Sequence, residues 1–296
     1  FINHWRPKLA IFVDSEIWPN MYYNLNKKKI PLVLLNARIT KRSFNRWKLF
    51  PTFSKKIFEK ITVALPQNEE SKKYLKLLGT RDIKFIGNLK FFGEIDKEKN
   101  NISILKKKFM KKKILCAAST HQKEELFIGY VHKGLKSKIK NLLTIIIPRH
   151  INRKREIISE LKSIGLKTQV HSKSRKLEKN TDIYLVDTYG EATKFYSFSK
   201  VTFLGGSLIP HGGQNPLEPA RKGNYILHGP NIENFREVYE MLKDLKITTK
   251  INSIAKMKTI IHQKINYTQD NKVNQKLKYL GNKILNKNLY ELNKFI

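Results

Sequence analysis

The sequence FLGGSLIPHGGQNPLEPARKGN, residues 203–224, decides the fold. An apolar strand over 201–204 runs into Gly-Gly-Ser at 205–207, and the segment 215–220 then begins a helix. Pro216 fits the first helical turn because no N–H is needed there. Strand, glycine loop and helix N-terminus is the arrangement by which a parallel sheet offers backbone N–H groups to an anion. Glycine lets the backbone approach a ligand closely and adopt positive φ.

The same stretch places Glu218 in the first turn of that helix, where its carboxylate can accept hydrogen bonds from two hydroxyls, as a ribose 2′,3′-diol offers. The alternative interpretation is a glycine-rich turn followed by a capped helix with an exposed glutamate. The stretch contains five glycines, and this density favours the ligand-binding interpretation.

The composition indicates a globular, strongly basic protein. Its 296 residues suffice for two domains, and 40% of them are apolar. The net charge of +35 favours anionic partners, which include nucleic acid, lipid headgroups and phosphorylated substrates. Lysine far outnumbers arginine, which is also what an AT-rich coding sequence gives. The lysine runs at 27–29, 106–108 and 111–113 are not interleaved with aromatic residues as in an RNA-binding surface.

The cysteine content, the length of the apolar runs and the first residues of the chain further limit the classes of protein to which the chain can belong. The single cysteine, Cys116, lies in an apolar run, so the sequence offers neither a disulfide framework nor a CxxC metal site. No apolar run approaches the roughly 18 residues that span a bilayer, and there is no signal peptide. The sequence starts at Phe1 without a methionine, and we expect it to be a fragment of a longer protein.

Hydrophobic runs alternate with helical patterns along the whole chain, which predicts α/β structure with parallel sheets. In the first half the predicted strands cover 9–13, 31–36, 61–65 and 83–86, separated by helices that end near Lys29, at Phe58 and at Leu78 before Gly79. The polar, lysine-rich segment 92–113 predicts a linker and an entry helix. The second-half strands are predicted at 114–118, 142–147, 183–186, 201–204 and 225–227, before a tail of basic helices over 251–296. We therefore predict domains over 1–100 and 101–296.

Polar segments follow four of the second-half strands, at 119–121, 148–150, 187–191 and 205–218. Since ligands bind outside the carboxyl ends of parallel strands, these segments predict a nucleotide pocket at one sheet edge. Neither GxGxxG nor GxxxxGK[ST] is present, which excludes the dinucleotide fingerprint and the P-loop.

These motifs, taken together, resemble those of the lipid A Kdo (3-deoxy-D-manno-octulosonic acid) transferases, which are inverting glycosyltransferases of the GT-B architecture. Beyond FLGGSLIPHGGQNPLEPA, the matching motifs occur in order over nearly the whole chain: SEIWPN (15–20), LNAR (35–38), GNLKF (87–91), AASTH (117–121), PRH (148–150) and DTYGE (187–191).

The resemblance implies two Rossmann-like domains with parallel sheets, of which the N-terminal one is incomplete here. It also implies transfer of Kdo from CMP-Kdo to a phosphorylated lipid A precursor, lipid IVA, in lipopolysaccharide biosynthesis. The expected location is the cytoplasmic face of the bacterial inner membrane, either peripheral or anchored by an upstream segment. No cofactor, metal or specific nucleic acid is expected.

The resemblance implies a role for a residue of this chain only where that residue matches a motif of the family. Glu16 and Lys90 match residues of the family that stabilise the transition state. Lys90 as an ordinary surface lysine is the competing interpretation. The nucleotide-binding positions implied by the resemblance are Pro148, Arg149, Tyr189, Gly190, Glu191, Asn215, Pro216, Leu217 and Glu218. The three histidines nearest these motifs, His121, His150 and His211, receive no catalytic role.

Two departures from the family pattern matter. The glutamate regarded as the general base precedes the SEIWPN segment and is absent from this chain, so the fragment is expected to be inactive if nothing replaces it. Within motifs, Gln214 stands where His is common, Tyr189 where Met is common, and Asp14 and Ala117 where Glu and Gly are common. Although Asp14 and Glu16 resemble an acidic metal motif, they fall in the acceptor half, and metal binding is not expected there.

The intact enzyme is expected to use a single displacement in which a base deprotonates the acceptor hydroxyl and CMP leaves. The basic segment 41–50 mixes cationic and aromatic residues and suits contact with an anionic membrane. A core-facing aromatic stripe with a solvated lysine face explains it equally well. Two alternatives remain open for the whole chain: a GT-B enzyme with a UDP-sugar donor, and a non-catalytic basic protein that binds nucleic acid.

Overall fold

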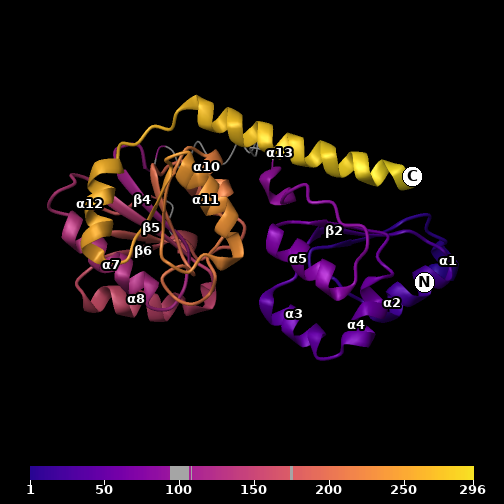
Figure 1. Cartoon of the computed structure of the whole chain (residues 1–296). Helices are drawn as coiled ribbons and strands as arrows, with labels where there is room; N and C mark the ends of the chain where they lie inside the picture. The colour runs from indigo at the N-terminus through magenta and orange to yellow at the C-terminus, as the bar shows by residue number, and fades with distance from the viewer. Residues whose placement is uncertain (94–106, 108, 174–175) are drawn as a thin grey trace. The chain divides into compact units, whose positions relative to one another are not determined.

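The computed structural model describes residues 1–93, 107, 109–173 and 176–296 (Figure 1). The chain divides into two compact units. Unit 1 comprises Phe1–Glu94 and Lys276–Ile296, and unit 2 comprises Ile95–Gln275. Both are α/β structures built on parallel sheets, as the sequence predicts.

Unit 1 contains a parallel sheet in the order β1-β2-β3, formed by Ala10–Val13, Leu32–Ala37 and Val63–Pro66. The fourth strand predicted at 83–86 is reduced to one bridge between Ile83 and Ala64. The helices are α1 (Ile2–Trp5), α2 (Pro19–Lys27), α3 (Lys41–Lys48), α4 (Pro51–Phe58), α5 (Glu69–Leu78) and the 3-10 turn η1 (Leu89–Phe91).

Local chemistry fixes the ends of these helices. The single helix predicted up to Phe58 is wrong, because it is broken before Pro51, which has no N–H to continue α3 and begins α4 instead. Asn68 caps α5 by accepting the backbone N–H of Ser71. Gly79 ends that helix at φ 112°, a left-handed conformation that glycine adopts without strain.

The C-terminal helix α13 (Asn271–Leu292) corrects the predicted domain boundaries, because the chain from Lys276 onward belongs to unit 1. Leu292 and Phe295 pack against the buried cluster of Val33, Val63 and Leu65. The Lys84 ammonium lies 2.6 Å from the Glu291 carboxylate. The sequence predicted that the basic tail belongs to the second domain, because the apolar residues against which it packs are far away in the sequence. Most of the predicted linker over 92–113 lies outside the described residues.

Unit 2 contains a parallel sheet in the order β10-β9-β8-β4-β5-β7-β6. The short strands β6 and β10 were not predicted, because their residues, TQV and TTK, are mostly polar. The strands are β4 (Lys113–Thr120), β5 (Leu142–Pro148), β6 (Thr168–Val170), β7 (Ile183–Leu185), β8 (Val201–Leu204), β9 (Tyr225–His228) and β10 (Thr248–Lys250). The helices are α7 (Glu124–Leu135), α8 (Lys154–Ser163), α9 (Ala192–Tyr196), α10 (Leu217–Arg221), α11 (Arg236–Asp244) and α12 (Ile254–Lys264).

The strand order positions the functional edge of unit 2. The first strand, β4, is central, and the chain adds β5, β7 and β6 on one side of it and β8, β9 and β10 on the other. The topology therefore reverses between β4 and β8. In open α/β sheets, ligands bind outside the carboxyl ends of the strands at such a switch point.

Candidate functional site at the switch point of unit 2

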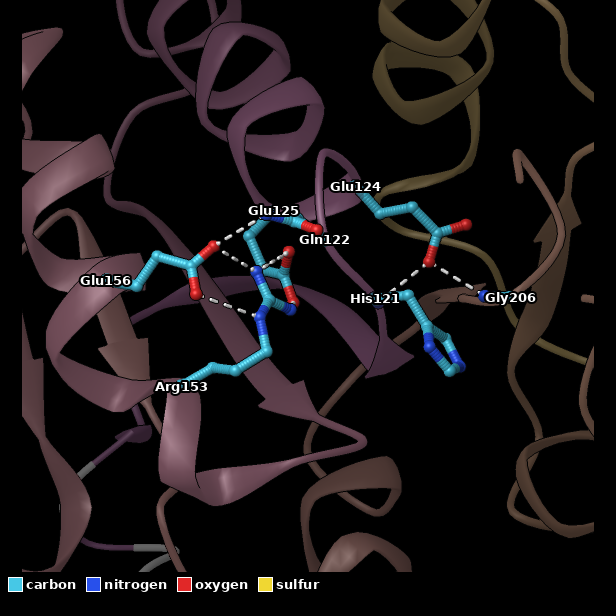
Figure 2. Close-up of polar contacts among 7 residues, drawn as sticks. All are labelled: His121, Gln122, Glu124, Glu125, Arg153, Glu156 and Gly206. Atoms are coloured by element: carbon cyan, nitrogen blue, oxygen red, sulfur yellow. Dashed lines mark hydrogen bonds and ion pairs between the residues drawn. The ribbon is translucent and has the colours of Figure 1, made fainter.

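The glycine loop after β8 and the loop after β4 meet at this switch point through one side chain, Glu124. Its carboxylate is buried and accepts backbone N–H groups from both loops (Figure 2). One oxygen accepts from His121 at 2.9 Å and Gly206 at 2.7 Å. The other accepts from Ser207 at 3.1 Å and Leu208 at 2.9 Å. Reaching back to the N–H of His121, Glu124 acts as the glutamate of a capping box does.

This contact corrects the expectation that the glycine loop offers its N–H groups to a ligand. The donors of Gly206, Ser207 and Leu208 are already satisfied by Glu124. Gly205 is needed for close packing, because a Cβ there would lie 2.4 Å from the carbonyl oxygen of Ser119. The loop is therefore a fixed wall of the site.

A second buried carboxylate, Glu125, is paired with Arg153. The Arg153 guanidinium lies between Glu125 at 2.9 Å and Glu156 at 3.1 Å (Figure 2). Burial raises the pKa of Glu125, and the hydrogen bond from Arg153 counteracts part of that rise. Burial opposes the charge of Arg153, but the two carboxylates outweigh it and raise the pKa of the guanidinium. Both acidic residues in the first turn of α7 are thus committed to contacts within the protein.

Three imidazoles gather at the same edge from three neighbouring strand ends. His121 follows β4, His150 follows β5 and His211 follows β8. The ring centroid of His121 lies 4.3 Å from that of His211 and 5.8 Å from that of His150. Sequence reasoning gave these histidines no role, although each lies in one of the four polar segments that were predicted to converge.

His121 is held neutral. Its side chain is 7% exposed, and its Nε2 atom has no hydrogen-bond partner among the described residues. Burial, followed by the nearby His211, His150, Arg149 and Arg153, lowers the pKa of His121 to about 4. An uncharged imidazole carries one N–H donor and one acceptor nitrogen.

The predicted PRH motif lies beside this cluster. Pro148 is buried at the end of β5, and the N–H of Arg149 donates to the carbonyl oxygen of Thr120 at 2.9 Å. The Arg149 side chain is exposed at the switch-point edge. An exposed guanidinium at a strand end can bind a phosphate or carboxylate through two parallel hydrogen bonds.

In the DTYGE motif after β7, some side chains are bound by contacts within the protein and others are exposed. Asp187 accepts hydrogen bonds from Lys154 at 2.7 Å and from Ser172, and these lower its pKa to about 2 against the effect of burial. Tyr189 is 69% exposed, and nothing lies within 4 Å of the Cβ position at Gly190. The carboxylate of Glu191 contacts the His171 ring at 3.2 Å and Lys194 at 3.3 Å.

The segment 215–218 forms the start of α10 as predicted. The Asn215 side chain accepts the backbone N–H of Leu217 at 3.1 Å, and Pro216 is the residue before the first helical turn. Leu217 is buried, whereas the Glu218 carboxylate is exposed in that turn. Glu218 is therefore accessible for the hydroxyl contacts that the sequence suggests.

The two predicted residues of unit 1 also lie at strand ends. Asp14 and Asn36, at the ends of β1 and β2, both have positive φ and share a hydrogen bond of 2.6 Å. The Lys90 ammonium lies 3.9 Å from Asp14, and Asn36 accepts the N–H of Leu89 at 2.9 Å. Glu16 accepts the indole N–H of Trp18 at 2.7 Å. Sequence reasoning missed the role of Asn36, whose only signal was its place in the LNAR motif.

The basic segment 41–50 contributes two aromatic rings to the core and leaves other apolar side chains exposed. Phe44 stacks on Tyr74 and Trp47 packs edge-on against Phe58, so these two rings support the core. Leu49 and Phe50 are exposed at the turn between α3 and α4. None of the helices in the described part of the chain is long and apolar enough to cross a membrane. The same residues contain no cluster of three or more His, Cys, Asp or Glu side chains arranged to hold a metal ion.

These features define a two-unit α/β protein of the GT-B type, in which polar segments gather at the switch point of unit 2. UDP-GlcNAc 2-epimerase from Neisseria meningitidis, solved with UDP-GlcNAc, shares the fold at a TM-score of 0.57 and 13% identity, over 98% of this chain and 78% of that one. The chain is similar to the 3-deoxy-D-manno-octulosonic acid (Kdo) transferases. The family model described as 3-deoxy-D-manno-octulosonic-acid transferase matches residues 1–93.

Two relatives cover more of the chain. The 3-deoxy-D-manno-octulosonic acid transferase of Haemophilus influenzae is 32% identical over 259 residues, which are 86% of this chain and 61% of that protein. The C-terminal CMP-Kdo binding domain of WaaA from Acinetobacter baumannii is 25% identical at a TM-score of 0.52, over 62% of this chain and 94% of that domain. The chain spans between 51% and 62% of the lengths of the curated Kdo transferases that it matches.

Proposed function

We propose that the protein carrying this chain transfers Kdo from CMP-Kdo to a phosphorylated lipid A precursor, lipid IVA, in lipopolysaccharide biosynthesis. The observation that carries the donor assignment is the likeness of 62% of this chain to the C-terminal CMP-Kdo binding domain of a WaaA protein, over 94% of that domain. In this assignment Arg149 binds the phosphate or the donor carboxylate, Glu218 binds the ribose, and the segment 189–191 surrounds the base. No metal is required in the proposed reaction.

Unit 1 supplies the acceptor side in this proposal. Lys90 and Glu16 stabilise the charge that develops as CMP leaves and the acceptor hydroxyl attacks. Support for a positioned Lys90 comes from its 3.9 Å contact with Asp14, which holds the ammonium at the strand-end edge of β1. Positive φ at both Asp14 and Asn36 is consistent with a functional edge, since strained backbone is concentrated at such sites.

Calorimetric titration with CMP, using UMP and UDP as competitors, tests the donor assignment. We expect saturable binding that is selective for CMP. Arg149→Gln should weaken CMP binding, whereas the matched control Arg155→Gln, an exposed arginine on α8, should not. Equal binding of UDP would contradict the donor and favour a UDP-sugar enzyme of the same architecture.

We propose in addition that the turn between α3 and α4 docks on the anionic cytoplasmic face of the inner membrane. Leu49 and Phe50 are 73% and 66% exposed, and they follow the basic helix that carries Lys41, Arg42, Arg46 and Lys48. Exposed apolar side chains beside a cationic helix face suit an interfacial contact with anionic lipid.

Vesicle co-sedimentation with phosphatidylglycerol-containing and purely zwitterionic lipid tests this contact. Phe50→Ser should reduce binding to the anionic vesicles, and Tyr279→Ser, an equally exposed aromatic residue on α13, serves as the control. An unchanged partition of Phe50→Ser would refute the docking surface. The chain binding both vesicle types equally would refute the charge contribution.

A further inference from the structure

His121 occupies the centre of the switch-point edge, and its ring position is fixed by the fold. Its backbone N–H is bound by Glu124, and its ring points away from that carboxylate (Figure 2). The ring packs against Gly206, where a Cβ would lie 3.3 Å from Nε2. Glycine at position 206 therefore leaves the space that this imidazole occupies.

The unpartnered Nε2 atom of His121 requires an explanation. A buried polar atom without a hydrogen bond is destabilising, and native proteins rarely retain one without a purpose. The His211 ring lies beside this atom: the two ring centroids are 4.3 Å apart, and a Cβ at Gly206 would lie 3.3 Å from His121 Nε2 and 3.4 Å from His211 Nδ1. His211 itself is exposed, so its side chain can turn aside when a ligand arrives.

The surroundings of His121 favour an anion. The charged or titratable groups that face its ring are His211, His150, Arg149 and Arg153. The nearest carboxylates, Glu124 and Glu125, are occupied by backbone N–H groups and by Arg153. A neutral imidazole whose Nε2 atom carries the proton can donate that N–H to a phosphate oxygen.

We propose that the His121 imidazole donates a hydrogen bond from Nε2 to the phosphate of the bound cytidine nucleotide, replacing its present contact with the His211 ring. This inference rests on the proposed function, because it takes CMP as the ligand of unit 2. It adds a binding residue after β4, in addition to the 215–218 segment after β8. The phosphate would then be bound by residues that follow two neighbouring strands.

The test compares CMP with cytidine, which lacks the phosphate, on the whole chain. His121→Phe keeps the ring volume and removes both nitrogens, while His121→Gln retains an N–H donor. We expect His121→Phe to raise the Kd for CMP by roughly 10- to 100-fold, as for a lost hydrogen bond to a charged group, and to leave that for cytidine within about twofold. His121→Gln should recover most of the loss. His262→Phe, an exposed histidine on α12, is the control.

A thermal melt establishes that each variant folds. If His121→Phe does not fold, imidazole ¹⁵N resonances of the wild-type chain give the second readout. CMP should shift the His121 Nε2 resonance and cytidine should not. Unchanged CMP affinity of the Phe variant, equal losses for CMP and cytidine, or an unmoved Nε2 resonance would overturn the inference while leaving the donor assignment intact. Absence of CMP binding by the wild-type chain would overturn the donor assignment and this inference with it.

Discussion

Glu124→Gln is the substitution that most directly tests how the switch-point edge is held. The carboxylate accepts four backbone N–H groups, two on each oxygen. Replacing either oxygen with an amide NH₂ removes the acceptor of two of these hydrogen bonds and places a donor opposite two N–H donors. A hydrogen bond to a charged group contributes about 1.5–3 kcal/mol, so losing two costs roughly 3–6 kcal/mol.

That loss is large against a typical folding free energy of about 5–15 kcal/mol. In a unit of this size about 1 kcal/mol shifts the melting temperature by roughly 2–4 °C, so we expect unit 2 to melt about 6–24 °C lower. Differential scanning calorimetry of the whole chain measures this shift, and it also separates the transitions of the two units if they unfold independently.

The matched control is Glu178→Gln. The Glu178 side chain is exposed and pairs with exposed Lys167 at 3.2 Å, a contact expected to contribute less than about 1 kcal/mol. A Glu124→Gln melting temperature within about 2 °C of wild type would refute the reasoning, because it would mean that the four N–H groups find other acceptors at no cost.

Three further predictions follow from the same edge. Gly205→Ala should lower the melting temperature strongly in a thermal scan, because its Cβ would lie 2.4 Å from the carbonyl oxygen of Ser119; an unchanged melt would contradict that packing. Glu218→Ala should weaken CMP binding by about 1–3 kcal/mol in calorimetry with little change in stability, since the carboxylate is exposed, and unchanged affinity would remove it from the ribose site. Burial lowers the pKa of His228 to about 4, below its unfolded value near 6.5, so its contribution to stability is full above about pH 6.5 and is lost as the pH falls toward 4. Melting temperatures between pH 7 and pH 4 should therefore depend less steeply on pH in His228→Gln than in wild type, and parallel curves would show that another group dominates.

The sequence predicted the strands of unit 2 well where they are long and buried on both faces. The runs at 114–118 and 142–147 are continuous apolar segments, and both are central strands. The short β6 and β10 at the sheet edges escaped prediction because their residues, TQV and TTK, are mostly polar, whereas the equally short β7, IYL, is apolar and was predicted. The assignment of most of α13 to unit 1 was not predicted for a different reason. A helical pattern identifies an apolar face but does not identify the surface against which that face packs.

The candidate site was predicted in its location and only partly in its contacts. Four polar segments were expected to follow strand ends in unit 2, and the strand order brings them to one edge. The role of Glu124 could not be predicted, because a buried carboxylate that accepts N–H groups more than 80 residues away has no local signal. For the same reason the glycine loop was wrongly predicted to be free to bind an anion. Its N–H groups do converge on an anion, but that anion is the Glu124 carboxylate.

The distribution of unsatisfied groups at this edge constrains how a nucleotide can lie there. The acidic residues nearest β4 are committed within the protein. Arg149, His150 and His211 are exposed, and the His121 Nε2 atom has no hydrogen-bond partner among the described residues. The accessible carboxylate, Glu218, lies on α10 beyond β8. A phosphate is repelled by Glu218 and attracted by the histidines and Arg149, whereas a ribose diol donates to Glu218. We therefore propose that a nucleotide binds with its phosphate over β4 and β5 and its ribose toward α10. A ligand bound in the opposite direction would place its phosphate beside the Glu218 carboxylate and leave its diol without that acceptor.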